Sequence, residues 1–249
     1  MIRLDARTAV VFGDWHGDLG FAATALAEAH STFTPDIYLH AGDFGFWPVD
    51  NEESWQPEYL QGLQKLLFAQ DRVLLWVDGN HEEHDWLSTF PVENGIQKIL
   101  PNIWHITRGA AVMLGDKKLV GLGGARSVDR SMRVLGSSWF GNEVISKADY
   151  ERAIRNKSAD LLLTHEAPDA PWISGSFDFI TDLESREQRR FVRRAAENLN
   201  VKLVIHGHHH RRYTNTDYSY RIEGLGCNDY PLTSDGIMNN RVYLDLENL

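Results

Sequence analysis

The sequence predicts an α/β protein with two packed β-sheets flanked by helices. Five short apolar runs, rich in β-branched and aromatic residues, stop abruptly at polar or glycine-bearing segments, as buried strands do. Helix-like stretches separate several of these runs, and that alternation is typical of α/β folds. The runs are TAVVFGD (8–14), DIYLHAGD (36–43), RVLLWVDGN (72–80), ADLLLTHE (159–166) and VKLVIHGH (201–208).

The remaining elements complete this architecture. Helices are expected over 19–30, 57–70, 146–157 and 184–199. A second set of strands is expected near 103–106, 110–114, 118–122, 219–225 and 241–246, and tight turns such as the one at Gly115 favour antiparallel pairing among them. The stretches at about 44–56 and 166–183 are irregular, aromatic and rich in Pro, Gly or Asp, so they are expected to be loops beside a site.

Length and composition favour one compact, soluble domain. The chain has 249 residues without an internal repeat or a Pro/Ser-rich linker, so we expect a single domain over 1–249. No apolar run approaches the roughly 20 residues of a membrane helix, which predicts no membrane association. The N-terminus lacks the pattern of a signal peptide, and the single cysteine, Cys227, suits a reducing compartment. A cytoplasmic location is therefore expected.

Charge restricts the class of partner. The formal net charge of −10 argues against a protein that tracks along long nucleic acid. Five arginines fall within 184–197, but three glutamates share that helix, which favours a solvated face with salt bridges. A small phosphate-ester substrate remains compatible with an acidic protein, because bound cations can reverse the local potential. The sequence leaves the oligomeric state open.

Side chains that can bind metal stand at the ends of the five apolar strands. In open α/β sheets, ligands bind at the carboxyl ends of the strands, so these side chains should gather at one edge. Asp14 and His16 are two residues apart, a spacing that points both side chains the same way in extended chain. The candidate ligands, in strand order, are Asp14 and His16, Asp43, Asn80, His165, and His208 with His210.

The donor types indicate the kind of ion. Carboxylate, amide and imidazole donors without a thiolate suit borderline or harder divalent cations and not a cysteine-based structural zinc site. Mn²⁺ is the ion that we expect, and Fe²⁺, Zn²⁺ or Ni²⁺ would also suit these donors.

The order of motifs GDWHGD, AGDFG, GNHE, LTHE and GHHH resembles that of the calcineurin-like metallophosphoesterases, from residue 10 to about 210. The resemblance implies a four-layer α/β/β/α sandwich, in which two mixed sheets pack face to face with helices outside. It also implies two metal ions: Asp14, His16 and His210 would hold the first, Asn80, His165 and His208 the second, and Asp43 would bridge them. His81 would be the catalytic histidine. The segments GLGGARSVDR and SSWFGNE look like those of small microbial and phage-type members.

The resemblance implies hydrolysis of a phosphate ester by a hydroxide that bridges the two metals. Two divalent ions held by two aspartates and a hydroxide keep a net charge of about +1, which attracts phosphate. His81 could then protonate the leaving oxygen or orient the phosphoryl oxygens. Small phosphodiesters, including 2′,3′-cyclic nucleotides, are the preferred substrate class. A phosphomonoesterase is the alternative, and a nuclease or a non-catalytic interaction scaffold are further ones.

Further residues have expected roles outside the set of metal ligands. Arg126, after a glycine turn, is the candidate for a protein cation that binds the substrate phosphate. Glu82 is expected to stabilise the following helix, because its negative charge would lie at the positive end of the helix dipole. His209 alternates with two ligands and should face substrate or solvent. Phe46 stands where the family's second motif usually has Asp or Asn, so an acid is missing there and a protein phosphatase is disfavoured.

Overall fold

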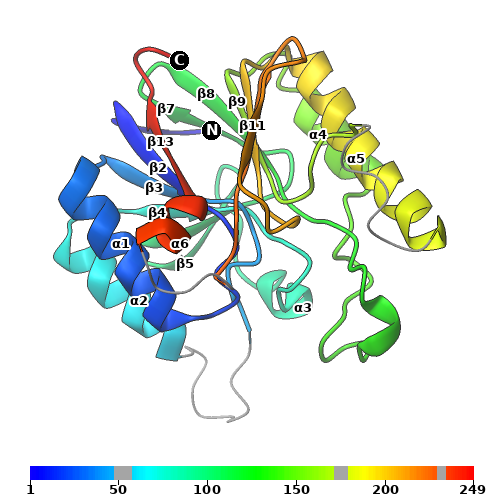
Figure 1. The fold of residues 1–249 in the computed structure, drawn as a ribbon, viewed down its shortest axis with the longest axis horizontal. Helices are drawn as coiled ribbons and strands as arrows, with labels where there is room; N and C mark the ends of the chain where they lie inside the picture. Colours follow the sequence, from blue (N-terminus) through cyan, green and yellow to red (C-terminus); the bar gives the residue numbers. More distant parts are fainter. Residues whose placement is uncertain (48–57, 171–178, 229–233) are drawn as a thin grey trace.

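One β-sheet is built mainly from strands in the first half of the chain. The computed structural model describes residues 1–47, 58–170, 179–228 and 234–249 (Figure 1). Among them, six strands form this sheet in the order β13-β2-β3-β4-β6-β5. Strands β2, β3, β4 and β6 run parallel, and the two edge strands are antiparallel to their neighbours. In the same order the strands are Arg241–Asp245, Thr8–Phe12, Ile37–His40, Leu74–Trp76, Ile103–Ile106 and Ile96–Leu100.

A second sheet is built mainly from the later part of the chain. Seven described strands form it in the order β1-β7-β8-β9-β10-β12-β11. Strands β8, β9, β10 and β12 are parallel, whereas β7 pairs antiparallel with β8 across the predicted turn at Gly115. In the same order the strands are Ile2–Leu4, Ala111–Leu114, Lys117–Leu122, Leu161–Thr164, Leu203–His206, Arg221–Gly224 and Tyr213–Asn215.

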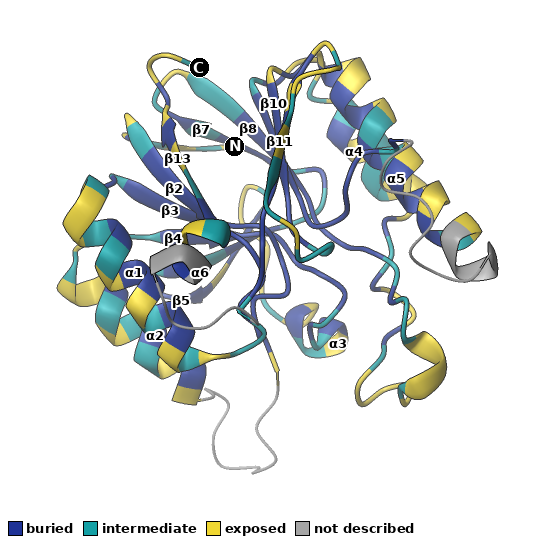
Figure 2. Cartoon of the chain, in the orientation of Figure 1, coloured by how far each residue is buried: buried dark blue, intermediate teal, exposed yellow. Residues whose placement is uncertain are grey.

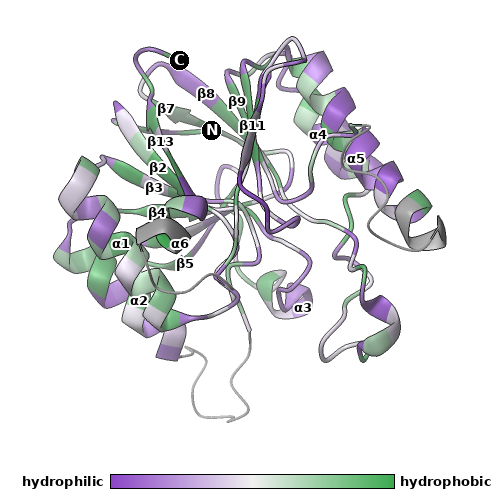
Figure 3. Cartoon of the chain, in the orientation of Figure 1, coloured by the Kyte–Doolittle hydropathy of each residue, from purple (hydrophilic) through white to green (hydrophobic). Residues whose placement is uncertain are grey.

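Helices cover the outer face of each sheet. The first sheet is covered by α1 (Leu19–Phe33) and α2 (Glu58–Ala69), and the second by α4 (Lys147–Ile154) and α5 (Phe179–Leu199) (Figure 1). Shorter helical segments are α3 (His84–Leu87), η1 (Arg130–Met132) and α6 (Ser234–Asn239). Figure 3 colours most of α5 hydrophilic, which agrees with its run of arginines and glutamates. No helix in the described ranges is long and apolar enough to cross a membrane.

The alternation of side chains along the strands creates three apolar layers. Val11 and Leu39 point between the two sheets and meet Leu163 and Ile205 of the opposite sheet. Val10 points the other way, toward the helices α1 and α2. The buried colour therefore runs through the inner strands while exposed residues lie on the outer sides of the helices (Figure 2). This arrangement confirms the four-layer sandwich, because each sheet is buried on both faces.

Some predicted boundaries were wrong. Helix α5 begins at Phe179 and not at 184, because residues 179–183 contain no Pro or Gly and continue the helix upstream. Helix α4 ends at Ile154 and not at 157, where Lys157 has a left-handed φ of 67°. The edge strands β1, β5 and β11 were not predicted. Parts of the two predicted loops, 48–56 and 171–178, lie outside the described residues, as does residue 57, where a predicted helix was to begin.

Candidate metal centre

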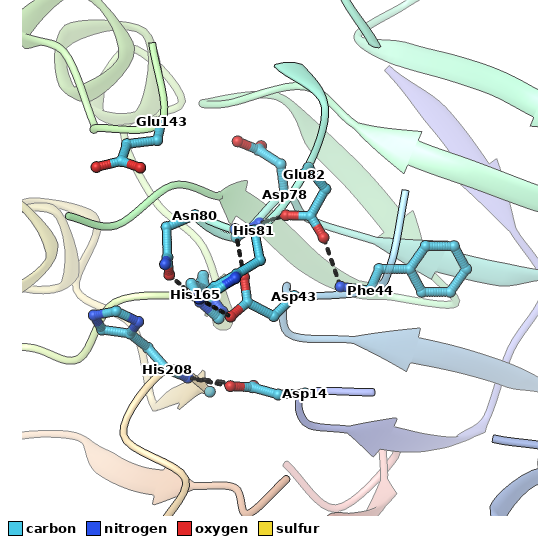
Figure 4. A network of polar contacts seen from close by, with 12 residues as sticks. Asp14, Asp43, Phe44, Asp78, Asn80, His81, Glu82, Glu143, His165 and His208 are labelled. Atoms are coloured by element: carbon cyan, nitrogen blue, oxygen red, sulfur yellow. Dashed lines mark hydrogen bonds and ion pairs between the residues drawn. The ribbon is translucent and has the colours of Figure 1, made fainter. Parts of the chain in front are cut away.

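The predicted ligands come from both sheets and meet where the strands end. Loops after β2, β3 and β4 carry the ligands from the first sheet, and loops after β9 and β10 carry those from the second. Figure 4 shows the labelled side chains of Asp14, Asp43, Asn80, His165 and His208 gathered in one place. The carboxyl ends of parallel strands lie on one edge of a sheet, so packing two such sheets face to face brings the two sets together.

The first group consists of Asp14, His16 and His210, with Asp43 beside them. One ligand atom from each of these four residues lies within 4.8 Å of the others. The Nε2 atom of His210 lies 3.1 Å from Asp14 Oδ2 and also 3.1 Å from His16 Nε2. Two carboxylates and two imidazoles around one point form a donor set that borderline divalent cations favour.

The second group consists of Asn80, His165 and His208, and it also adjoins Asp43. His165 Nε2 lies 3.0 Å from Asn80 Oδ1 and 3.2 Å from Asp43 Oδ1. The opposite ring nitrogen of His165 donates to the carbonyl of Ala41 at 2.8 Å, which turns Nε2 toward the centre. The rings of His165 and His208 are 5.0 Å apart. The structure thus brings the seven predicted ligands together, with Asp43 in contact with both groups.

The backbone around these ligands is unusual. His16, Asp43, His208 and His210 all have φ values between 45° and 64°, in the left-handed region that non-glycine residues rarely adopt. Such conformations cost free energy and persist where the surrounding structure enforces them, which is common at functional sites. Gly79 packs directly on Asp43, and a side chain there would overlap the Asp43 carboxylate.

The aspartates of the group attract positive charge. Burial lowers the pKa of His165, but Asp43 and Asp14 outweigh it and raise the pKa to about 10. Burial likewise lowers the pKa of His210, while hydrogen bonds with Asp14 and Cys227 raise it to about 11. These imidazoles therefore carry positive charge beside the aspartates. A bound cation would replace that charge.

Polar atoms of Asp43 and His208 lie beyond hydrogen-bond distance from the neighbours named below, which is compatible with metal binding. Asp43 is 1% exposed, yet its Oδ2 lies 3.8 Å from His16 and 3.9 Å from His81, beyond hydrogen-bond distance. The side chain of His208 is 8% exposed, and its Nε2 lies 3.9 Å from Glu166. Buried polar atoms normally have closer partners, and a bound cation would supply such a partner to a carboxylate oxygen or an imidazole nitrogen.

His81 adjoins the centre without belonging to either group of ligands. Its backbone N–H donates to Asp43 Oδ1 at 2.9 Å, and its side chain is 27% exposed. Trp47 Nε1 donates to the His81 carbonyl. Burial lowers the pKa of His81, Asp43 raises it and the neighbouring Arg133 lowers it, with a net lowering. A partly exposed imidazole next to the metal donors can exchange protons with a substrate.

A buried relay that the sequence analysis missed holds the amide of Asn80. Asn80 Nδ2 donates to Ser127 Oγ at 3.1 Å, and that hydroxyl donates to Glu143 Oε2 at 2.6 Å. The Ser127 N–H also donates to Glu143 Oε1 at 2.9 Å. The amide nitrogen is thereby turned away from the centre and Asn80 Oδ1 toward it. The segments GGARS and FGNE supply Ser127 and Glu143, but their sequence separation gave no sign of the contact.

Glu82 has a different role from the one predicted. Helix α3 begins at His84 with Glu83 as its cap, so Glu82 lies before the helix. Its buried carboxylate accepts hydrogen bonds from Phe44 N at 2.6 Å and Gly79 N at 2.5 Å (Figure 4). Burial and the charge of Asp43 raise the pKa of Glu82 to about 8. Glu82 therefore ties the loop after β3 to the loop after β4.

Other predicted residues lie in contacts outside the two groups. Arg126 forms an ion pair with Glu184 at 3.5 Å. His209 was expected to face substrate or solvent, but its Nε2 lies 2.9 Å from the buried Glu166. Phe46 is fully buried and stacks on Trp86, which explains why an apolar residue stands at this position.

Comparison with known proteins agrees with this architecture. The fold and site define an α/β/β/α sandwich with a candidate metal centre at its sheet edge. A model of the calcineurin-like phosphoesterase family matches residues 7–212. Because this match covers more than half of the chain, the protein belongs to that family.

Individual proteins resemble this chain either over a short stretch or at low sequence identity. An uncharacterized protein from Haemophilus influenzae is 40% identical over 74 residues, which is 29% of this chain and 26% of that protein. One solved structure superposes with a TM-score of 0.58 at 11% identity, covering 98% of this chain and 96% of the other. A phosphatase from Mycoplasma pneumoniae has a TM-score of 0.46 and 13% identity, covering 90% of this chain and 73% of the other. At such identities, the 0.58 match shows the fold alone.

Proposed function

We propose that this protein is a two-metal-dependent phosphoesterase that hydrolyses small phosphodiesters, including 2′,3′-cyclic nucleotides, with Mn²⁺ as the working ion. The observation that carries the proposal is the convergence of six further candidate ligands on Asp43, with His81 beside them. Mixed oxygen and imidazole donors suit Mn²⁺, and Fe²⁺, Zn²⁺ or Ni²⁺ would fit the same set.

The protein groups have distinct tasks in this proposal. Asp14, His16 and His210 would hold one ion, and Asn80, His165 and His208 the other, with the Asp43 carboxylate between them. When bound, the ions supply Lewis acidity toward the phosphate and a nucleophile at neutral pH. The donors sit on short loops at the ends of buried strands, so the sheets fix their positions before substrate arrives.

His81 would donate the proton to the leaving oxygen. Its imidazole is not required as a ligand, and its backbone N–H is fixed on the Asp43 carboxylate, which holds the residue beside the centre. A lowered pKa makes a protonated imidazole a stronger acid, so the proton would transfer readily to a basic alkoxide. This task is needed most when the leaving group is an alcohol.

A direct comparison of substrates tests the diesterase proposal. Purified protein is loaded with Mn²⁺, and kcat/KM is measured for bis-p-nitrophenyl phosphate and p-nitrophenyl phosphate, which share one leaving group. We expect the diester to be preferred at least about tenfold. A preference for the monoester would identify a phosphomonoesterase instead. The Asp43→Asn protein serves as the control for activity from a contaminating enzyme.

A further inference from the structure

Arg133 lies beside His81, and its side chain is 13% exposed. Its Nε is 2.7 Å from Asp129, and its Nη1 donates to the carbonyl of Ser138 at 3.1 Å. Its Nη2 lies 2.7 Å and 2.6 Å from the two ring nitrogens of His81. Among the described residues, Nη2 contacts this imidazole, whereas the ion pair with a carboxylate is made by Nε.

The segment that carries Arg133 has a surplus of positive charge. Arg126 and Arg130 both pair with the one carboxylate of Glu184, at 3.5 Å and 3.8 Å, and Arg133 pairs with Asp129. In these ion pairs three guanidinium groups meet two carboxylates. The chain as a whole has a net charge of −10, so this positive segment differs from the rest of the molecule. A local positive excess beside a phosphoesterase centre favours an anionic ligand.

A pocket lies where Arg133 adjoins His81, and Arg126 and Arg130 are not in its lining. It has a volume of about 340 Å³ and is lined by Trp47, His81, Glu82, Arg133, Ser137, Ser138 and Phe140. A water molecule occupies about 30 Å³ in the liquid, so the pocket has room for more than a single small ion. The metal-binding side chains are not part of this lining. The pocket therefore adjoins the centre through His81.

The polar groups of the pocket suit a phosphate. Ser138 Oγ accepts a hydrogen bond from Val134 N at 2.9 Å, so its own proton is free to be donated elsewhere. Ser137 is part of the same lining. A guanidinium edge with adjacent hydroxyl donors matches the several acceptor oxygens of a phosphate group.

We propose that this pocket binds a phosphate group carried by the leaving-group part of the substrate, with Arg133 as its principal contact. The inference rests on the proposed function, because a leaving group that takes a proton from His81 must extend past that residue. It narrows the substrate class to phosphodiesters whose leaving alcohol bears a second phosphate. Nucleoside cyclic phosphates with a 5′-phosphate are members of this class.

A matched pair of probes isolates the second phosphate. Adenosine 2′,3′-cyclic phosphate with and without a 5′-phosphate has the same reacting bond, so the ratio of the two kcat/KM values reports the extra anion alone. A charge-assisted hydrogen bond contributes enough for a preference of about 10- to 100-fold for the 5′-phosphorylated probe. Arg133→Ala should reduce the ratio to near one, and Arg133→Lys should keep part of it. Arg130→Ala, on the same segment, should keep the full preference. A wild-type ratio near one would overturn the inference.

Binding measurements separate this inference from the proposed function. Calorimetry compares 5′-AMP with adenosine on the Mn²⁺-loaded wild type, Arg133→Ala and Arg130→Ala proteins. We expect 5′-AMP to bind at least about tenfold more tightly to the wild type and the Arg130 variant, with the difference lost in the Arg133 variant. If the probes are not hydrolysed but this pattern holds, the diesterase proposal fails and the anion pocket stands. If the three proteins bind 5′-AMP equally, the anion pocket is refuted.

Discussion

Ser127→Ala should weaken one metal site and spare the other. The change removes the oxygen that accepts from Asn80 Nδ2 at 3.1 Å and donates to Glu143 at 2.6 Å. Without this oxygen, the amide of Asn80 loses the contact that keeps Nδ2 away from the centre. A rotated amide would direct N–H groups at the cation, and an amide N–H cannot act as a ligand.

The magnitude follows from burial. Asn80 is 2% exposed and Glu143 is fully buried, so neither recovers a full water contact. An unsatisfied buried polar group costs about 1–3 kcal/mol. Loss of a group that orients a ligand typically lowers metal affinity about 10- to 100-fold. We expect a loss of that size at the ion that Asn80, His165 and His208 would hold, and little change at the ion that Asp14, His16 and His210 would hold.

Competition with a chelator of known Mn²⁺ affinity, fitted to two sites, measures both affinities. Ser127→Thr keeps a hydroxyl and should recover most of the loss, and Ser31→Ala, on the exposed side of α1, controls for handling. Far-ultraviolet circular dichroism checks that the fold is intact. An equal loss at both sites in a folded protein, or unchanged binding at both, would refute the role of Ser127.

Further outcomes test the centre itself. Asp43→Asn should lose both ions, because one carboxylate serves both groups; elemental analysis that finds two ions per chain in this variant would exclude a bridging role. His81→Ala should keep both ions while kcat falls about 10²- to 10⁴-fold for nucleoside esters and less for nitrophenyl esters, whose leaving group needs no proton. An equal loss on both substrates would instead indicate phosphate positioning, and loss of an ion would make His81 a ligand. His165 and His210 have pKa values raised to about 10 and 11, so at pH 7 both imidazoles are protonated in the metal-free protein and must release their protons to bind cations. Mn²⁺ affinity should therefore rise with pH, and calorimetry in buffers of different ionisation enthalpy should detect about two protons released per chain; binding without proton release would contradict the assigned pKa shifts.

The sequence by itself determined the fold class and the family. Buried parallel strands must be apolar on both faces, so runs such as VVF and LLL are visible without any knowledge of contacts. Each candidate ligand follows its strand within a few residues, and strand ends meet at one edge by topology alone. Local spacing was therefore sufficient to name the side chains that the structure gathers around Asp43.

The tertiary structure decided which groups surround those ligands. Arg126 and Arg133 are both arginines of one segment, and only the path of the chain places Arg133 on His81 and Arg126 on Glu184. Ser127 reaches Asn80 across 47 positions in the sequence, with no periodic pattern to mark the pair. Strand periodicity and motif spacing encode backbone geometry over a few residues. Hydrogen bonds and ion pairs between distant loops depend on how those loops pack, which is fixed only when both sheets and their helices are in place.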